Sequence, residues 1–89
     1  MSVQKPLEIR VSIDVGCYRH AVAVGLSTGA LIDEFEMDHN QAGFDSFFEK
    51  IHTIETQYMA SVSIAMEGYN GWARPLDQHI LSHGYTLFN

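Results

Sequence analysis

The chain has 89 residues, of which 46% are apolar, and this composition is typical of one small folded domain rather than a disordered tail. Its net charge of -6 argues against a surface that grips nucleic acid mainly through phosphates. The single cysteine, Cys17, excludes an internal disulfide, and no apolar run approaches the roughly 20 residues that span a bilayer. Since no signal segment is evident at the N-terminus, a cytoplasmic protein is expected.

Three strands are predicted in the first 37 residues. Segment 10–16 alternates apolar and polar side chains with a period of two, and segment 21–26 is nearly all apolar. Segment 31–37 continues as a third strand, with Leu31, Phe35 and Met37 expected on one face. Because the connecting turns are short, the three strands are expected to form an antiparallel meander.

A helix is predicted to begin after Asn40, a residue type that commonly caps helix N-termini. The residues that follow place one apolar stripe at helical spacing: Phe44, Phe47, Phe48, Ile51, Ile54 and Tyr58. No polar residue interrupts this stripe, so it is interpreted as core packing against a sheet and is given no chemical role.

Segment 61–67 alternates again and is predicted to be a fourth strand. A strand, helix, strand order favours a crossover that sets this strand parallel to, and next to, the first one. A second helix is predicted from the spacing of Trp72, Leu76 and Ile80, and a fifth strand from segment 85–88. The expected fold is therefore α/β with a five-stranded mixed sheet.

Two carboxylates stand at the ends of the two strands that are expected to be neighbours. Asp14 follows Ser12 on the first strand, and Glu67 follows Ser63 and Ala65 on the fourth, with the same parity. Carboxyl ends of adjacent parallel strands meet at one edge of a sheet, and Mg²⁺ is commonly held by one or two carboxylates plus water and phosphate. Asp14 and Glu67 are thus predicted to form a Mg²⁺ or Mn²⁺ site. Alternatively, Glu67 only caps the turn that follows it.

The histidines are weaker candidates. His79 and His83 stand four residues apart on the second predicted helix, but no third metal ligand at suitable spacing accompanies them. The remaining three are interpreted as scattered polar positions: His20, His39 and His52.

Cys17 has no CxxC partner and no predicted base beside it, so it is not expected to act as a nucleophile. Arg19 and Arg74 lie near the two carboxylates in sequence. They are interpreted as surface charges, with phosphate contact as the alternative.

Two motifs carry a resemblance to a known family. Ile-Asp-Val-Gly at 13–16 and Met-Glu-Gly-Tyr-Asn-Gly-Trp-Ala-Arg-Pro-Leu at 66–76 resemble the N-terminal part of the DEDD transposases of bacterial insertion sequences. The resemblance extends over 9–89. It implies an RNase H-like (RuvC-like) mixed sheet in which three strands, a helix, a strand, a helix and a strand follow one another. Residues 1–89 would then be the N-terminal portion of a truncated transposase domain.

The resemblance also implies a function and partners. Asp14 and Glu67 would be catalytic metal ligands of a DNA transposase, with the other acidic residues and a serine beyond Asn89. The isolated fragment would be inactive, and the full-length protein would bind DNA and a structured guide RNA. One departure is that Gly-Tyr-Asn-Gly at 68–71 stands where many relatives have Thr-Gly-Gly.

Two other functions stay open. Actin/sugar-kinase-like proteins also begin with an Asp-x-Gly strand and a three-stranded meander, although they usually place Thr or Ser after the glycine, where this chain has Cys17 and Tyr18. The third possibility is a non-catalytic interaction module. An open sheet edge in so short a chain also leads us to expect a homo-oligomer.

Overall fold

The computed structural model describes residues 6–67 and 74–88. It contains five strands and two helices in the predicted chain order, which confirms a mixed α/β fold. The elements are β1 (Glu8–Asp14), β2 (Arg19–Leu26), β3 (Leu31–Asp38), α1 (Gln41–Tyr58), β4 (Ser61–Glu67), α2 (Arg74–Ser82) and β5 (Thr86–Phe88). Trp72, predicted to lie on the second helix, falls outside the described residues.

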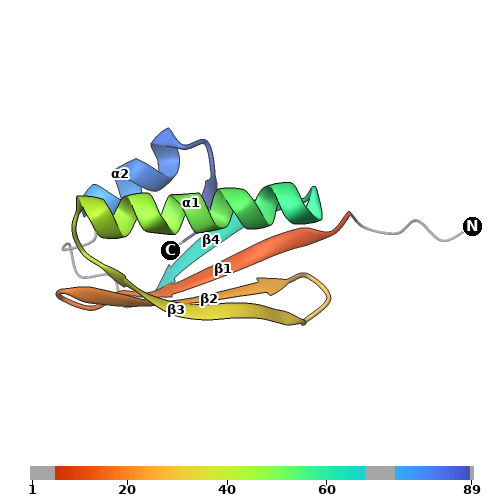
Figure 1. Ribbon diagram of the computed structural model, residues 1–89, viewed down its shortest axis with the longest axis horizontal. Helices are drawn as coiled ribbons and strands as arrows, with labels where there is room; N and C mark the ends of the chain where they lie inside the picture. Colours follow the sequence, from red (N-terminus) through yellow and green to blue (C-terminus); the bar gives the residue numbers. More distant parts are fainter. Residues whose placement is uncertain (1–5, 68–73, 89) are drawn as a thin grey trace, which may run out of the picture.

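The five strands form one sheet in the order β3-β2-β1-β4-β5 (Figure 1). β1 pairs antiparallel with β2 and β2 with β3, whereas β4 runs parallel to both β1 and β5. The predicted placement of β4 beside β1 is therefore confirmed. The RNase H-like assignment does not follow from this, because actin/sugar-kinase-like proteins also begin with such a meander.

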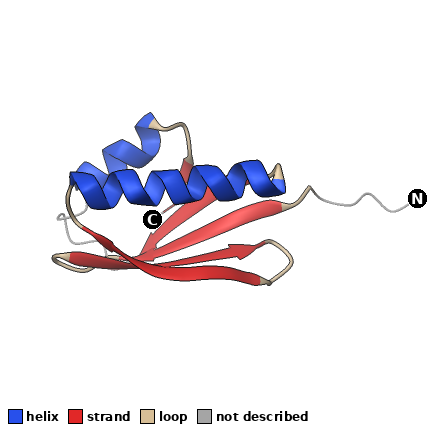
Figure 2. Ribbon diagram, viewed as in Figure 1, coloured by secondary structure: helices blue, strands red, loops and turns tan. Residues whose placement is uncertain are grey.

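Both helices lie on the same side of the sheet (Figure 2). Every second side chain of a strand is buried between the sheet and the helices, as in Ile9, Val11 and Ile13 of β1. The alternate side chains point to the uncovered face. Within residues 6–67 and 74–88, no helix covers that second face. The small side chains there include Ala21 and Ala23, so backbone and ligand can approach closely.

Helix α1 begins as the sequence predicted. The Asn40 side chain accepts a hydrogen bond from the Gly43 amide at 2.7 Å, which satisfies one of the free N–H groups of the first turn. The predicted stripe is buried from Phe44 to Ile54, with Tyr58 half-buried at the end. No helix of the described segments is long and apolar enough to cross a membrane.

One predicted face is wrong at the start of β3. Leu31 was expected beside Phe35 and Met37, but it is 63% exposed. The register shifts at Val24 and Gly25 of β2, so that Gly25 pairs with Leu31 although Val24 pairs with Asp33. This irregularity inserts an extra residue, and side chains on either side of it no longer share a face.

Candidate functional site

Asp14 and Glu67 end two adjacent parallel strands and are paired in register. Just beyond them, the Val15 amide donates a hydrogen bond to the Glu67 carbonyl oxygen at 2.9 Å, so the two strand ends are tied together. Both side chains point to the uncovered face and are exposed. The predicted juxtaposition of the two residues is thus present. Whether they hold a metal ion stays a prediction.

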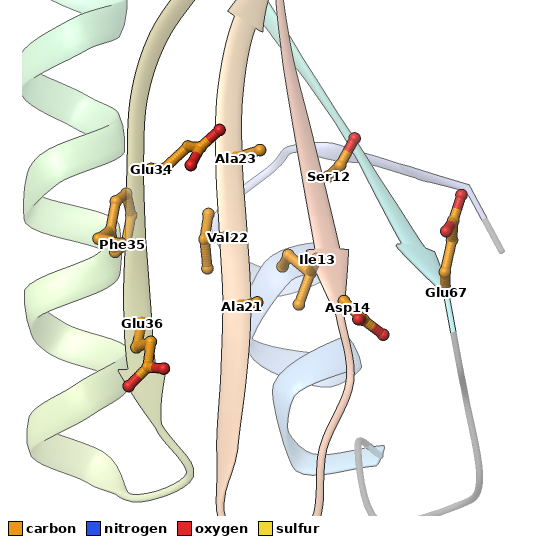
Figure 3. Close-up of a pocket in the computed structure, with 10 residues that line it drawn as sticks. All are labelled: Ser12, Ile13, Asp14, Ala21, Val22, Ala23, Glu34, Phe35, Glu36 and Glu67. Atoms are coloured by element: carbon orange, nitrogen blue, oxygen red, sulfur yellow. The ribbon is translucent and has the colours of Figure 1, made fainter.

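The two carboxylates border a shallow hollow of about 410 Å³ on the uncovered face (Figure 3). Its floor includes the small side chains of Ser12, Ala21 and Ala23. In Figure 3 the carboxylates of Asp14 and Glu67 point in different directions rather than at each other. A shared ion therefore requires a rotation of these side chains, which their exposure permits.

The hollow is strongly acidic. Glu34 and Glu36 of β3 line it together with Asp14 and Glu67. Negative charges gathered in one place raise the local affinity for cations and repel a free phosphate. A phosphate group is therefore expected to bind in this hollow only together with a cation that neutralises its charge.

Arg19, the first residue of β2, is engaged by carboxylates of β3. Its guanidinium binds Glu36 and Asp38, each at 3.1 Å. These hydrogen bonds and charges, with Glu36 first, raise the pKa of Arg19. Arg19 therefore behaves as a surface ion-pair partner rather than a free phosphate ligand. The side chain of Arg74 lies outside the described residues.

A complete protein cage for a metal is absent from residues 6–67 and 74–88, where no three His, Cys, Asp or Glu side chains converge on one point. His79 and His83 do not form a metal pair. The His83 ring nitrogen Nδ1 lies 2.7 Å from the His79 carbonyl oxygen, and its ring stacks on Phe48 with centroids 3.8 Å apart. A cation at Asp14 and Glu67 would depend on water or phosphate oxygens for its other ligands.

The turn after Asp14, at residues 15–18, is tightly built. A β-carbon at Gly16 would overlap the carbonyl oxygen of Arg19, so only glycine fits there. Cys17 and Tyr18 are exposed at the tip. Neither is the Thr or Ser expected at this place in an actin/sugar-kinase-like protein.

The interpretation of His20 as a scattered polar residue is wrong, because His20 is completely buried. Its Nδ1 accepts a hydrogen bond from the Gly16 amide at 3.1 Å, and its Nε2 lies 2.8 Å from Nδ1 of His39. Burial, followed by the nearby His39, lowers the pKa of His20. A signal was present in the sequence, since His20 falls on the buried alternation of Val22 and Val24.

Comparison with known proteins gives a fold and no family. No family model matches the chain, and no curated protein matches it. Among solved structures, it is similar to the Aquifex aeolicus member of the Ppx/GppA protein family, with a TM-score of 0.50 and 10% identity. The match covers 93% of this chain and 35% of that one, so the chain spans about a third of its structural neighbour.

This neighbour corrects the resemblance to DEDD transposases. Ppx/GppA proteins are an actin/sugar-kinase-like family, and no transposase supports the likeness that the two motifs suggested. The prediction of a RuvC-like DNA transposase, as family and as enzyme, is therefore wrong. Short motifs such as Ile-Asp-Val-Gly end a strand with a carboxylate and a glycine turn, and unrelated functions share that local geometry. The DNA and guide-RNA partners rested on the same resemblance and stay predictions.

Proposed function

We propose that this chain supplies a metal-dependent phosphate-binding lobe of an actin/sugar-kinase-like, nucleotide-binding protein. The observation that carries the proposal is the in-register pair of Asp14 and Glu67 at the carboxyl ends of β1 and β4, beside an open hollow. Ligands of open α/β sheets commonly bind beyond the carboxyl ends of parallel strands. The likeness to the Ppx/GppA structure supports the fold on which the proposal rests.

The negative charge of the site determines in which form a nucleotide can bind. Four carboxylates line the hollow, namely Asp14, Glu34, Glu36 and Glu67, and Arg19 is held by Glu36 and Asp38. A nucleotide phosphate is therefore expected to bind only as its Mg²⁺ complex. Mg²⁺ suits this role because it keeps several waters and bridges one or two carboxylates to phosphate oxygens. The metal would neutralise phosphate charge, and the turn after Asp14 would set the position of the carboxylate that holds it.

The test is an NMR titration of the 89-residue chain with ATP, in Mg²⁺ and in EDTA. Shifts of the amides near residues 14–16 and 67 are expected only with Mg²⁺, and inorganic triphosphate separates phosphate recognition from nucleotide recognition. Asp14→Asn should weaken binding at least about tenfold, as expected for the loss of a charged ligand. Glu49→Gln, the same charge change on the exposed face of α1, is the matched control.

Three results would contradict the proposal. The first is equal binding of ATP in EDTA and in Mg²⁺. The second is unchanged binding after Asp14→Asn. Shifts confined to residues of α1 or β5 would place the ligand elsewhere and would likewise reject this site.

A non-catalytic interaction module is the second candidate. It is favoured by the uncovered sheet face and by the short edge strand β5, where Phe88 is 57% exposed. Exposed edges and apolar side chains invite a partner. Saturable binding of Mg²⁺-ATP at Asp14 would rank the first proposal above this one.

A further inference from the structure

A hydrogen bond to a buried histidine side chain stabilises the turn at residues 15–18. The Gly16 amide donates to Nδ1 of His20 at 3.1 Å, across the turn that joins β1 to β2. His20 itself is completely buried, with its side chain on the same side of the sheet as Val22 and Val24. An imidazole thus acts as the hydrogen-bond acceptor for a backbone amide two residues beyond Asp14.

The hydrogen bonds determine the protonation state of this imidazole. A backbone N–H can only donate, so Nδ1 of His20 carries no proton. In the neutral ring the proton is then on Nε2, which donates to Nδ1 of His39 at 2.8 Å. His39 must in turn keep its own Nδ1 unprotonated. The pair is therefore satisfied only when both rings are neutral.

A second bond ties the same two segments together. The His39 amide donates to the Tyr18 carbonyl oxygen at 2.9 Å, just beyond the end of β3. The turn is thus attached to residue 39 through the backbone and through the His20 side chain. A change in the histidine pair acts on the turn directly.

We infer that His20 is a positioning residue, whose neutral imidazole holds the turn after Asp14 in place and releases it when either histidine of the pair is protonated. A proton on Nδ1 of His20 would face the Gly16 N–H, and a proton on Nδ1 of His39 would face the Nε2–H of His20. Each event replaces an attraction with a repulsion between two donors. The effect on ligand binding, though not the effect on the turn, rests on the proposed phosphate function.

The surroundings of His20 favour the neutral state. His39 is the titratable group in contact with it. Beyond His39, the ring of Phe44 separates the pair from His79; its centroid lies 5.2 Å from that of His39 and 5.3 Å from that of His79. Arg19, adjacent in sequence, points to the other face and is paired there with carboxylates of β3. Cys17 and Tyr18 lie exposed in the turn itself.

Two substitutions separate positioning from simple filling of the core. His20→Asn places a carbonyl oxygen near the position of Nδ1 and cannot titrate, whereas His20→Phe keeps a flat ring and removes the acceptor. His52→Asn, at an exposed position of α1, is the matched control. The measurements are the ring-nitrogen NMR shifts of His20, the Gly16 amide shift and the affinity for Mg²⁺-ATP, each between pH 5 and 8.

In the wild-type chain, His20 should show the Nε2–H form at pH 7.5, and the Gly16 shift should titrate with the protonation of the pair. His20→Asn should keep the Gly16 shift and the Mg²⁺-ATP affinity constant with pH. His20→Phe should displace the Gly16 shift and lower the affinity about tenfold, the effect of one hydrogen bond. His52→Asn should behave as wild type.

Several outcomes overturn the inference: an Nδ1–H form of His20 at pH 7.5, a Gly16 shift that His20→Phe leaves unchanged, or pH dependence that persists in His20→Asn. If His20→Phe does not fold, the ring-nitrogen shifts and the Asn variant still decide. If no variant binds Mg²⁺-ATP, the proposed function fails, but the Gly16 shift continues to test the role of His20.

Discussion

Asp14 and Glu67 are in-register partners at the ends of two parallel strands, 53 positions apart in sequence, and the Val15 amide ties the two ends with a 2.9 Å bond to the Glu67 carbonyl. The backbone therefore holds the two carboxylates at one level, although their side chains point apart (Figure 3). This combination of a rigid frame and free carboxylates suits a weak cation site that is completed by the ligand.

Mn²⁺ should broaden a localised set of NMR signals if the cation site exists. We expect paramagnetic broadening at residues 14–16 and 67 at low Mn²⁺ concentration, and competition by Mg²⁺. Glu67→Gln should remove most of this broadening, whereas Glu49→Gln should leave it unchanged. Uniform broadening over all acidic residues would show that the ion only follows the net negative charge.

Neutralising either carboxylate should leave the fold intact in the absence of metal. Asp14→Asn and Glu67→Gln each relieve like-charge repulsion at the strand ends, and we expect a gain in unfolding free energy below about 1 kcal/mol because both groups are exposed. Thermal melting in EDTA measures this change. A clear loss of stability would mean that the carboxylates stabilise the strand ends themselves rather than serve as ligands of a cation.

Stability should fall on mild acidification because of His20. Its pKa is lowered in the folded chain, chiefly by burial, so below the ordinary value of about 6.5 the unfolded chain binds a proton more readily than the fold does. The contribution of His20 is fully present above that value and is lost as pH falls toward the lowered pKa. Urea unfolding at pH 7.5, 6.5 and 5.5 tests the sign, and His20→Asn should flatten this component.

The stability of the first turn of α1 should depend on Asn40. Asn40→Ala removes the acceptor for the Gly43 amide, and we expect a loss of about 1 kcal/mol, with a decrease of about 4–8 °C in melting temperature. Asn40→Asp keeps an acceptor at the same position and should retain most of the stability. Equal losses in both variants would assign the effect to something other than the cap.

The edge strand β5 should promote self-association, as expected from the sequence. β5 pairs with β4 on one side, and Phe88 is 57% exposed. Thr86→Lys should reduce association because a charged edge disfavours pairing, whereas Thr56→Lys on the exposed side of α1 should not. Light scattering over a range of concentrations measures the difference. A wild-type chain that stays monomeric at high concentration would contradict this prediction.

The sequence by itself determined the local elements and their order. Alternation with period two in β1 and β4, the Asn40 cap and the aromatic stripe of α1 are short-range patterns, and each predicted its element to within about two residues at either end. The chain order also led to the correct neighbour for β4, because a strand, helix, strand sequence restricts the possible pairings. The sequence alone therefore predicts that Asp14 and Glu67 lie together.

Only the tertiary structure decided what depends on contacts between distant segments. The irregularity between β2 and β3 that exposes Leu31 is a property of strand pairing, and Gly25, which lies at it, marks a possible bulge without fixing the register. The burial of His20 and its bond to His39 likewise arise where the turn meets the end of β3. The motifs at 13–16 and 66–76 describe strand ends, which many proteins share, so they suggested the wrong family. Fold comparison uses the spatial arrangement of the whole sheet, and for that reason it could correct them.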